Sequence, residues 1–266
     1  MKGVPRLVVT ACALAQGVVV TAAEPASKPG KARPDAEKEA VARGQQVLLE
    51  TPRQSIEGTM YVPPKAGKIE LPVYPYDLLR QRITGEASVS CMINTEGMVI
   101  NTRVMKATRP EFGAALVAAL EATRFGHATK EGEPIASVLG FRHTFNPKDH
   151  AEKDWQPEIE LLERAVRRPQ TLGKARDLDR PLRPREQRSP AFPPSLLSRG
   201  VGGEALIEFL LDETGRARLP RIVSATDPSF GYAAVHAVAQ WRFEPPTARG
   251  EPTVMRVAIP FTFRVD

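Results

Sequence analysis

The sequence predicts an α+β protein built from two small domains, each a three-stranded antiparallel sheet with helices packed on one face. Three observations support this prediction: an internal repeat, the same order of strand and helix patterns in both copies, and punctuating segments rich in Pro and Gly. The chain has 266 residues, 42% of them hydrophobic, with 25 prolines and 19 glycines. This composition is enough for packed cores that are joined by linkers.

The internal repeat relates positions that lie 118 residues apart, because Gly85–Ala87 has the same sequence as Gly203–Ala205. At this offset roughly a third of the positions match without a gap, which is far beyond chance. Two copies indicate a duplicated domain and not a solenoid. The residues that define the motif are Pro75, Gly85, Gly97, Arg124 and Phe125 in the first copy and Pro193, Gly203, Gly215, Trp241, Arg242 and Phe243 in the second.

The second copy begins with a short helical segment and a β-hairpin. Pro193–Arg199 has Pro at its start and glycines directly after its end, as short helices often do. Glu204–Leu211 and Arg216–Ser224 have the composition of strands. The turn between them places Gly215 where a positive φ is wanted. The first copy repeats this order.

A helix and a third strand complete each copy. Asp227 can cap the helix, and apolar residues recur at helical spacing as far as Trp241. Val254–Arg264 alternates like a last strand. Because the helix returns the chain, the third strand should lie antiparallel beside the first. The predicted strand order is therefore 2-1-3 with a right-handed crossover, and the third strand lies at an edge of the sheet.

The N-terminal segment is typical of a secretory signal peptide. Lys2 and Arg6 precede an apolar run that starts at Leu7, and small residues near Ala22 offer cleavage positions. We therefore assign residues 1–23 to a signal peptide and predict a periplasmic location. Two alternatives stay open, namely an uncleaved anchor in the inner membrane and lipidation at Cys12.

The remaining segments separate the predicted domains, which span residues 71–147 and 189–266. Residues 24–70 are predicted to be a linker with a short helix at 36–50. Residues 148–188 are predicted to form a helix and then a basic linker that contains Pro. The basic stretch from Thr171 to Arg188 has two interpretations: a solvated linker, or a patch for an anionic surface such as lipopolysaccharide or peptidoglycan.

No pattern in the sequence is typical of catalysis or metal binding. The four histidines lack the spacing of metal ligands, and no phosphate-binding loop or catalytic Cys–His pattern occurs. We predict no enzymatic activity, no cofactor and no small-molecule substrate. The net charge of +6 is a mild excess that does not indicate nucleic-acid binding. Cys91 is predicted to be a core residue, and His236 to be partly exposed on its helix.

Both copies resemble the TonB C-terminal domain family. In the second copy the resemblance rests on Phe192-Pro193-Pro194, Gly203-Glu204-Ala205, Asp212-Glu213-Thr214-Gly215 and Trp241-Arg242-Phe243-Glu244-Pro245. In the first copy it rests on Val73-Tyr74-Pro75, Gly85-Glu86-Ala87, Thr95-Glu96-Gly97 and Thr123-Arg124-Phe125. The first copy departs from the family where Thr123 replaces the usual Trp and where no Pro follows Phe125.

The resemblance implies a protein that binds protein partners, among them TonB-dependent outer-membrane receptors, by adding a partner strand to its sheet edge. An edge strand offers unpaired backbone groups for this purpose. The residues expected along the edges are Ala136, Val138, Gly140 and Arg142 in the first copy and Val254, Arg256 and Ala258 in the second. Pro260 removes one donor, so the first edge is predicted to be the more open.

Two classes of function follow from the sequence. The first is a TonB-like partner of energised transport across the outer membrane. The alternative is a periplasmic protein-binding or scaffold module that is not coupled to transport. A transducer needs a long spacer, yet Glu24–Asp35 would span only about 35 Å even as polyproline II. No feature of the sequence defines an oligomeric state, a particular receptor or its substrate.

Overall fold

The computed structural model describes residues 61–65, 70–146 and 156–265, together with the backbone of three short strands. These strands are β1 (Val8–Cys12), β2 (Val19–Val20) and β3 (Leu48–Glu50). Most of the predicted signal peptide and of the predicted linker over 24–70 lies outside the described residues. No helix in the described part of the chain is long and apolar enough to cross a membrane.

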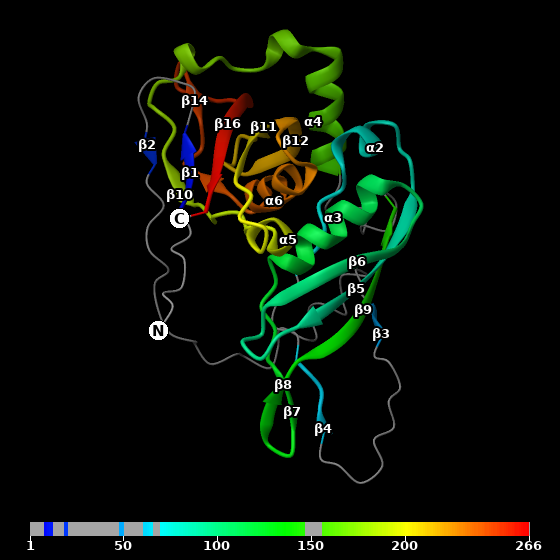
Figure 1. The fold of residues 1–266 in the computed structure, drawn as a ribbon. Helices are drawn as coiled ribbons and strands as arrows, with labels where there is room; N and C mark the ends of the chain where they lie inside the picture. The colour runs from blue at the N-terminus through cyan, green and yellow to red at the C-terminus, as the bar shows by residue number, and fades with distance from the viewer. Residues whose placement is uncertain are drawn as a thin grey trace.

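The first domain has the predicted order of elements (Figure 1). They are α2 (Tyr76–Arg80), β5 (Gly85–Ile93), β6 (Val99–Ala107), α3 (Pro110–Glu121), β7 (Ala128–Lys130), β8 (Glu133–Ile135) and β9 (Ser137–Phe145), preceded by β4 (Tyr61–Val62). β5 lies between β6 and β9 and is antiparallel to both. The predicted order 2-1-3 is therefore confirmed, and β3 adds a fourth strand beside β9.

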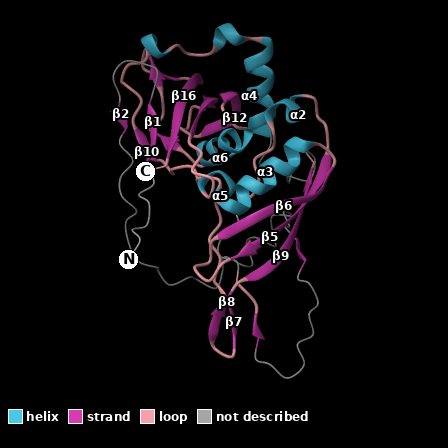
Figure 2. Ribbon diagram, in the orientation of Figure 1, coloured by secondary structure: helices cyan, strands magenta, loops and turns pink. Residues whose placement is uncertain are grey.

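The second domain repeats this architecture (Figure 2). Its elements are α5 (Pro194–Leu197), β11 (Gly203–Leu211), β12 (Ala217–Ala225), α6 (Pro228–Val238), β13 (Arg242–Phe243), β14 (Thr247–Ala248), β15 (Glu251–Pro252) and β16 (Met255–Arg264). The sheet order is β12-β11-β16-β1-β2. Both third strands thus pair with N-terminal strands, which corrects the prediction that they form the edges.

Each core lies between one face of the sheet and its long helix. Alternate residues of β5, including Val89 and Cys91, are buried against Phe112 and Leu116 of α3. The core position predicted for Cys91 is therefore confirmed. Three aromatic rings close each core at equivalent positions: Tyr74, Phe112 and Phe145 in the first domain and Phe192, Phe230 and Phe263 in the second. The rings combine edge-on and stacked contacts, which aromatic pairs favour.

The two domains pack together through equivalent elements. α3 contacts α6, while α2 packs on β12 of the second domain and α5 packs on β6 of the first. Arg188 and Glu70, which the repeat relates to each other, form an ion pair of 3.3 Å across the contact. The arrangement resembles a two-fold symmetric dimer that has been joined into one chain.

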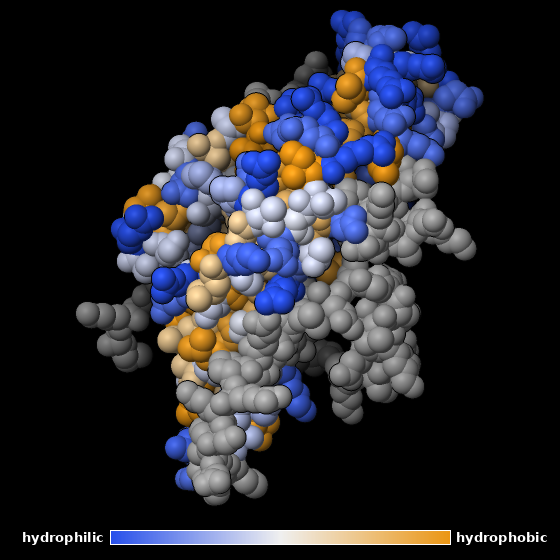
Figure 3. Space-filling model, turned by 90° about the vertical axis from the view of Figure 1, so that its right-hand side faces the viewer, coloured by the Kyte–Doolittle hydropathy of each residue, from blue (hydrophilic) through white to orange (hydrophobic). Residues whose placement is uncertain are grey.

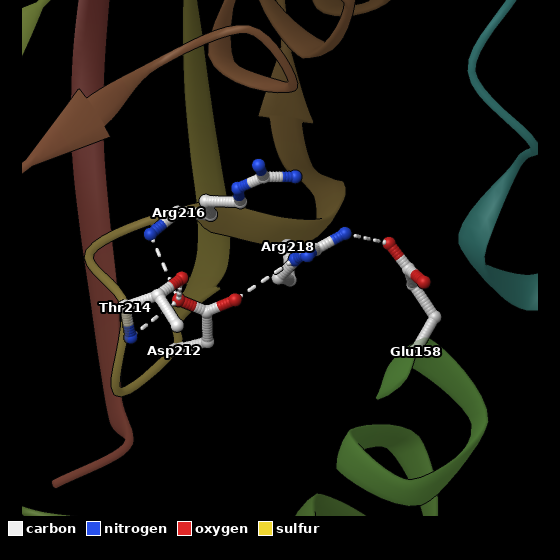
Figure 4. A network of polar contacts seen from close by, with 5 residues as sticks. All are labelled: Glu158, Asp212, Thr214, Arg216 and Arg218. Atoms are coloured by element: carbon white, nitrogen blue, oxygen red, sulfur yellow. Dashed lines mark hydrogen bonds and ion pairs between the residues drawn. The ribbon is translucent and has the colours of Figure 1, made fainter. Parts of the chain in front are cut away.

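The helix α4 (Gln156–Arg167) fastens the segment between the domains to the second sheet. Its buried Leu161 and Leu162 belong to the same apolar cluster as Leu210 and Leu219. Figure 4 shows Arg218 between two carboxylates, Glu158 on α4 and Asp212 in the β11–β12 turn. Asp212 also accepts hydrogen bonds from Thr214 and from the backbone N–H of Arg216.

The segment after α4 is folded against the second domain. It contains η1 (Pro169–Thr171), η2 (Ala175–Asp177) and β10 (Pro184–Glu186), and β10 pairs with β13. Asp179 receives hydrogen bonds of 2.8 Å from the backbone N–H groups of Arg249 and Gly250. The indole of Trp241 donates to the carbonyl of Arg188. The solvated linker predicted over 171–188 is therefore attached to the second domain at several points, while most of its side chains are exposed.

These attachments are themselves part of the repeat. The N–H of Glu244 donates to the carbonyl of Arg183, and the N–H of Gly126 donates to the carbonyl of Lys65, 118 residues earlier in both partners. Asp179 and Thr247 correspond to Tyr61 of β4 and Thr129 of β7. β4 pairs with β7 in the first domain, and the N–H of Asp179 donates to the carbonyl of Thr247 in the second. The structural repeat thus extends beyond the sequence motif to residues 61–65 and 179–183.

The motif glycines in the hairpin turns permit a close backbone contact. Gly97 and Gly215 have φ values of +76° and +82°. A Cβ on Gly215 would lie 2.2 Å from the carbonyl oxygen of Phe243. That closeness follows from the hydrogen bond in which the N–H of Phe243 donates to the carbonyl of Gly215 over 2.7 Å. The turn therefore requires glycine twice, for its dihedral angle and for its contact.

We predict that Gly215→Ala destabilises the protein more than Gly200→Ala does. Gly200 also has positive φ but has open space around its Cβ position. The control should therefore cost about 1–2 kcal/mol for the backbone conformation alone. Gly215→Ala adds a steric clash of about 1–3 kcal/mol. Urea denaturation measures both free energies of unfolding, and equal losses would contradict the prediction.

A second prediction concerns pH. Burial opposes ionisation of Asp212, but hydrogen bonds from Thr214, Arg216 and Arg218 outweigh it and hold the carboxyl pKa below its ordinary value. A carboxyl whose pKa is lowered by folding stabilises the folded state at pH values above its ordinary pKa. This stabilisation is lost as the pH falls through the folded-state pKa. Asp212→Asn should therefore cost about 1–3 kcal/mol of unfolding free energy at neutral pH.

The same comparison at acid pH supplies the control. The difference between Asp212→Asn and the wild type should narrow as the pH falls below 3.8, the ordinary pKa of an aspartate. Chemical denaturation at several pH values measures this difference. A difference that stays constant over the whole acid range would show that the charge of Asp212 does not stabilise the turn.

Candidate functional site

The residues predicted to line the edges lie on, or directly before, the third strands. Val138, Gly140 and Arg142 belong to β9, while Ala136 immediately precedes it. Arg256 and Ala258 belong to β16, while the buried Val254 immediately precedes it. All seven occupy alternate positions of the two chain segments. Their backbone groups therefore point toward the same side of their strand.

Pro260 shows which side that is. It lies opposite Leu206 of β11 in an unbroken register, although a proline has no N–H to donate. A proline is accommodated within a sheet where its nitrogen points away from the neighbouring strand. The backbone groups of Arg256 and Ala258, which alternate with Pro260, therefore point away from β11 as well. By the repeat, Val138, Gly140 and Arg142 direct theirs away from β5.

Short strands of the same chain occupy part of each outward side. β3 is antiparallel to β9 and pairs its three residues with Gly140, Phe141 and Arg142. β1 is antiparallel to β16 and pairs with residues Phe261 to Arg264, so that its register ends just before Pro260. Within the described residues, Ser137–Leu139 and Arg256–Ile259 have no strand on their outward side.

The opposite borders of the two sheets are less suited to strand addition. The pairing of β6 with β5 and of β12 with β11 is irregular at two equivalent places in each domain. Asn101 and Leu219 adopt positive φ at these irregularities. Such bulges twist an edge and interrupt its row of donors and acceptors. The regular borders of β9 and β16 are therefore the candidate sites.

Burial shifts the pKa of three titratable groups that lie outside β9 and β16. His236 on α6 is only 3% exposed, which overturns its predicted surface position, because α6 packs against the first domain. Burial lowers the pKa of His236 to about 4, so it is neutral at pH 7. Burial also raises the pKa of Cys91 to about 12 and that of Glu121 to about 7. No cluster of potential metal ligands occurs among the residues described.

Sequence reasoning missed the N-terminal strands and the repeated attachment of residues 61–65. Pro63 corresponds to Pro181 and Lys65 to Arg183 at the offset of 118, and this signal could have extended the repeat. No comparable signal marks β1 or β3. Strand pairing uses backbone groups, so it leaves little trace in the side chains.

Comparisons with known proteins agree with the repeat. The model of the family described as Gram-negative bacterial TonB protein C-terminal matches residues 70–147 and 188–265. Protein TonB of Vibrio cholerae serotype O1 is 28% identical over 90 residues, which are 34% of this chain and 37% of that relative. The chain thus spans little more than a third of the relative's length. The solution NMR structure of the Pseudomonas aeruginosa TonB CTD is 23% identical and covers 32% of this chain and 87% of its own, with a TM-score of 0.29.

The pairing of β3 with β9 predicts a pattern of amide exchange. Leu48→Pro combined with Glu50→Pro removes the two β3 donors that face Arg142 and Gly140 and so detaches β3. The outward amides of Gly140 and Arg142, which donate to β3, should then exchange at least about fivefold faster. The amides of Leu139 and Phe141 point toward β5 and should keep their protection. Hydrogen exchange measured residue by residue distinguishes the two sets.

The matched control replaces the same two residues by threonine. Leu48→Thr with Glu50→Thr changes the same side chains but keeps the backbone donors, so protection of Gly140 and Arg142 should persist. Faster exchange in the threonine variant, or unchanged exchange in the proline variant, would mean that backbone pairing does not hold β3 in place.

Proposed function

Because this chain belongs to the family of Gram-negative bacterial TonB protein C-terminal domains and contains two of them, we propose that it binds protein partners of the cell envelope by strand addition. The proposed sites are the outward sides of β9 and β16. The observation that carries the proposal is that both sides pair with an antiparallel strand in the full chain: β3 on β9, and β1 of the predicted signal peptide on β16. The edges are therefore competent to bind an extended backbone.

The chemistry of binding resides in the backbone. Each outward residue of β9 presents one N–H and one C=O, and an unpaired group of this kind favours any extended segment that can satisfy it. The neighbouring side chains are varied, with the exposed Val138 and Arg142 on either side of Gly140. They contribute to the choice of partner, while the main chain supplies most of the affinity.

A partner strand on β9 would have to compete with β3, whereas β1 lies within the predicted signal peptide and would be removed with it. β3 has only three residues, whereas β9 has nine. A longer strand can begin on the uncovered residues Ser137–Leu139 and then displace β3 by making the same bonds over a greater length. The internal strand thus lowers the affinity for short, nonspecific segments and favours extended ones. It also shields a sheet edge that would otherwise promote aggregation.

A location in the envelope and a link to energised transport are further parts of the proposal. The relative from Vibrio cholerae is named Protein TonB, and the predicted signal peptide supports export. A TonB-dependent outer-membrane receptor is therefore the proposed partner.

One observation favours the second candidate, a scaffold that is not coupled to transport. Residues 169–188 are folded along the second domain, as β10 and Asp179 show. They are attached along the second domain and do not act as an extended spacer. A rigid pair of edges suits a protein that brings two partner segments together.

The internal repeat supplies a precise test of the edge. Arg142 occupies the position that Pro260 has in the second domain, so Arg142→Pro should remove one outward donor without disturbing the pairing with β5. We expect it to weaken partner binding by about fivefold, the contribution of one hydrogen bond. Arg142→Ala, which keeps the donor, is the matched control.

Cross-linking and recovery of partners from cell envelopes measures the effect. The wild-type chain should recover a TonB-dependent receptor, Arg142→Pro should recover less, and Pro260→Ala should recover as much or more. Equal losses in Arg142→Pro and Arg142→Ala would assign the effect to the side chain and contradict strand addition. Recovery of no receptor, where an authentic transducer recovers one, would reject the link to transport.

A further inference from the structure

The net charge of the chain is concentrated in one segment. Residues 164–188, called the basic strap below, contain nine of the 37 Lys and Arg residues but only three of the 31 Asp and Glu residues. The rest of the chain therefore has 28 residues of each sign, and the whole formal excess of +6 belongs to the strap. A charge so confined creates a local positive potential on a protein that is otherwise balanced.

The second domain holds the basic strap in a fixed course. The N–H of Gly173 donates to the carbonyl of Val254 over 2.7 Å, and that of Asp179 donates to Thr247 over 2.9 Å. Leu178 and Leu182 pack on the core of the second domain. Further along, β10 pairs with β13. The cations are therefore displayed on a folded surface, and their arrangement costs little entropy when a ligand binds.

The strap cations are also available for binding. Lys174, Arg180, Arg183 and Arg185 are exposed. None of the four forms an ion pair within the described part of the chain, whereas Arg164 and Arg188 do. Figure 3 shows hydrophilic side chains gathered at the upper end of the molecule, where Figure 1 places the end of α4 and the turns that follow it.

We propose that the basic strap binds the phosphate groups of an anionic lipid surface. Eight of its nine cations are arginines, whose planar guanidinium groups match phosphate oxygens in pairs. The segment has no aromatic residue, so it lacks the stacking platforms that single-stranded nucleic acids require. It runs along the outside of the second domain from the end of α4 to β10 (Figure 1), where its cations can meet head groups.

This binding would orient the protein as well as localise it. The strap passes beside the first residues of β16, where Gly173 bridges to Met255. Both candidate edges belong to a pair of domains that is fixed by α3 and α6. A surface that holds the strap would therefore present β9 and β16 at a set angle to partners in the same membrane.

Sedimentation with lipid vesicles tests the proposal on the full chain. The wild type should bind vesicles of phosphatidylglycerol mixed with phosphatidylcholine and should not bind vesicles of phosphatidylcholine alone. The strap variant combines Lys174→Gln, Arg180→Gln, Arg183→Gln and Arg185→Gln. We expect it to bind the anionic vesicles at least about tenfold more weakly than the wild type, because each basic residue near such a surface adds to the attraction.

A matched variant removes the same charge from the first domain. It combines Lys65→Gln, Arg80→Gln, Arg103→Gln and Lys130→Gln, all of which are exposed. This variant should keep most of the vesicle binding, and thermal unfolding should show that both variants fold. Equal losses in the two variants would overturn the proposal, since net charge alone would then explain binding.

Two other outcomes would also overturn it. One is a wild-type chain that fails to bind the anionic vesicles. The other is strap-dependent binding to soluble polyglutamate without binding to vesicles, which would identify an acidic polymer as the ligand. Recovery of partner proteins depends on β9 and β16, so the strap variant should retain it in detergent. Failure of this inference is thus distinguishable from failure of the proposed strand addition.

Discussion

The structure depends on one constraint: backbone donors and acceptors at the border of a sheet must find partners. The 2-1-3 order places the last strand of each domain at such a border, because the first strand has neighbours on both sides. The chain meets this demand in two ways. β3 and β1 pair with the outward groups directly, and Pro260 deletes one donor from the second border. The strand addition that we propose uses the same groups, so a partner would compete with the strands that protect the edges.

Duplication gave the protein a second way to bury its surface. A helix covers one face of each sheet, and the two helices then cover each other, which is why His236 on α6 is buried rather than exposed. α4 covers the other face of the second sheet, where the ion pairs of Arg218 hold it. The two copies are therefore alike in fold but differ in surroundings. Such differences allow one copy to support the assembly while the other binds.

The sequence predicted whatever is encoded by local pattern. Gly215 marks its turn because positive φ and the contact with Phe243 both exclude other residues, and the alternation in β5 follows from burial of one face. Three features escaped prediction because they depend on contacts between distant segments. His236 needed the packing of α3 on α6. The strap was taken for a linker because its attachments are backbone bonds and two half-buried leucines. β3 is only three residues long and pairs through its main chain.

The two edges differ because Arg142 of β9 corresponds to Pro260 of β16. Arg142 keeps its N–H on the outward side of β9, whereas Pro260 interrupts the outward row of β16 after Ala258. An incoming strand on β16 would lose a bond in the middle of the register, and β1 ends at that same point. On β9 the row continues from Val138 to Arg142. Since each lost hydrogen bond lowers affinity by a similar factor, a partner that can bind either border should prefer β9. If both proposals hold, the second domain, to which the basic strap and α4 are attached, holds the protein on a surface while the first domain binds its partner.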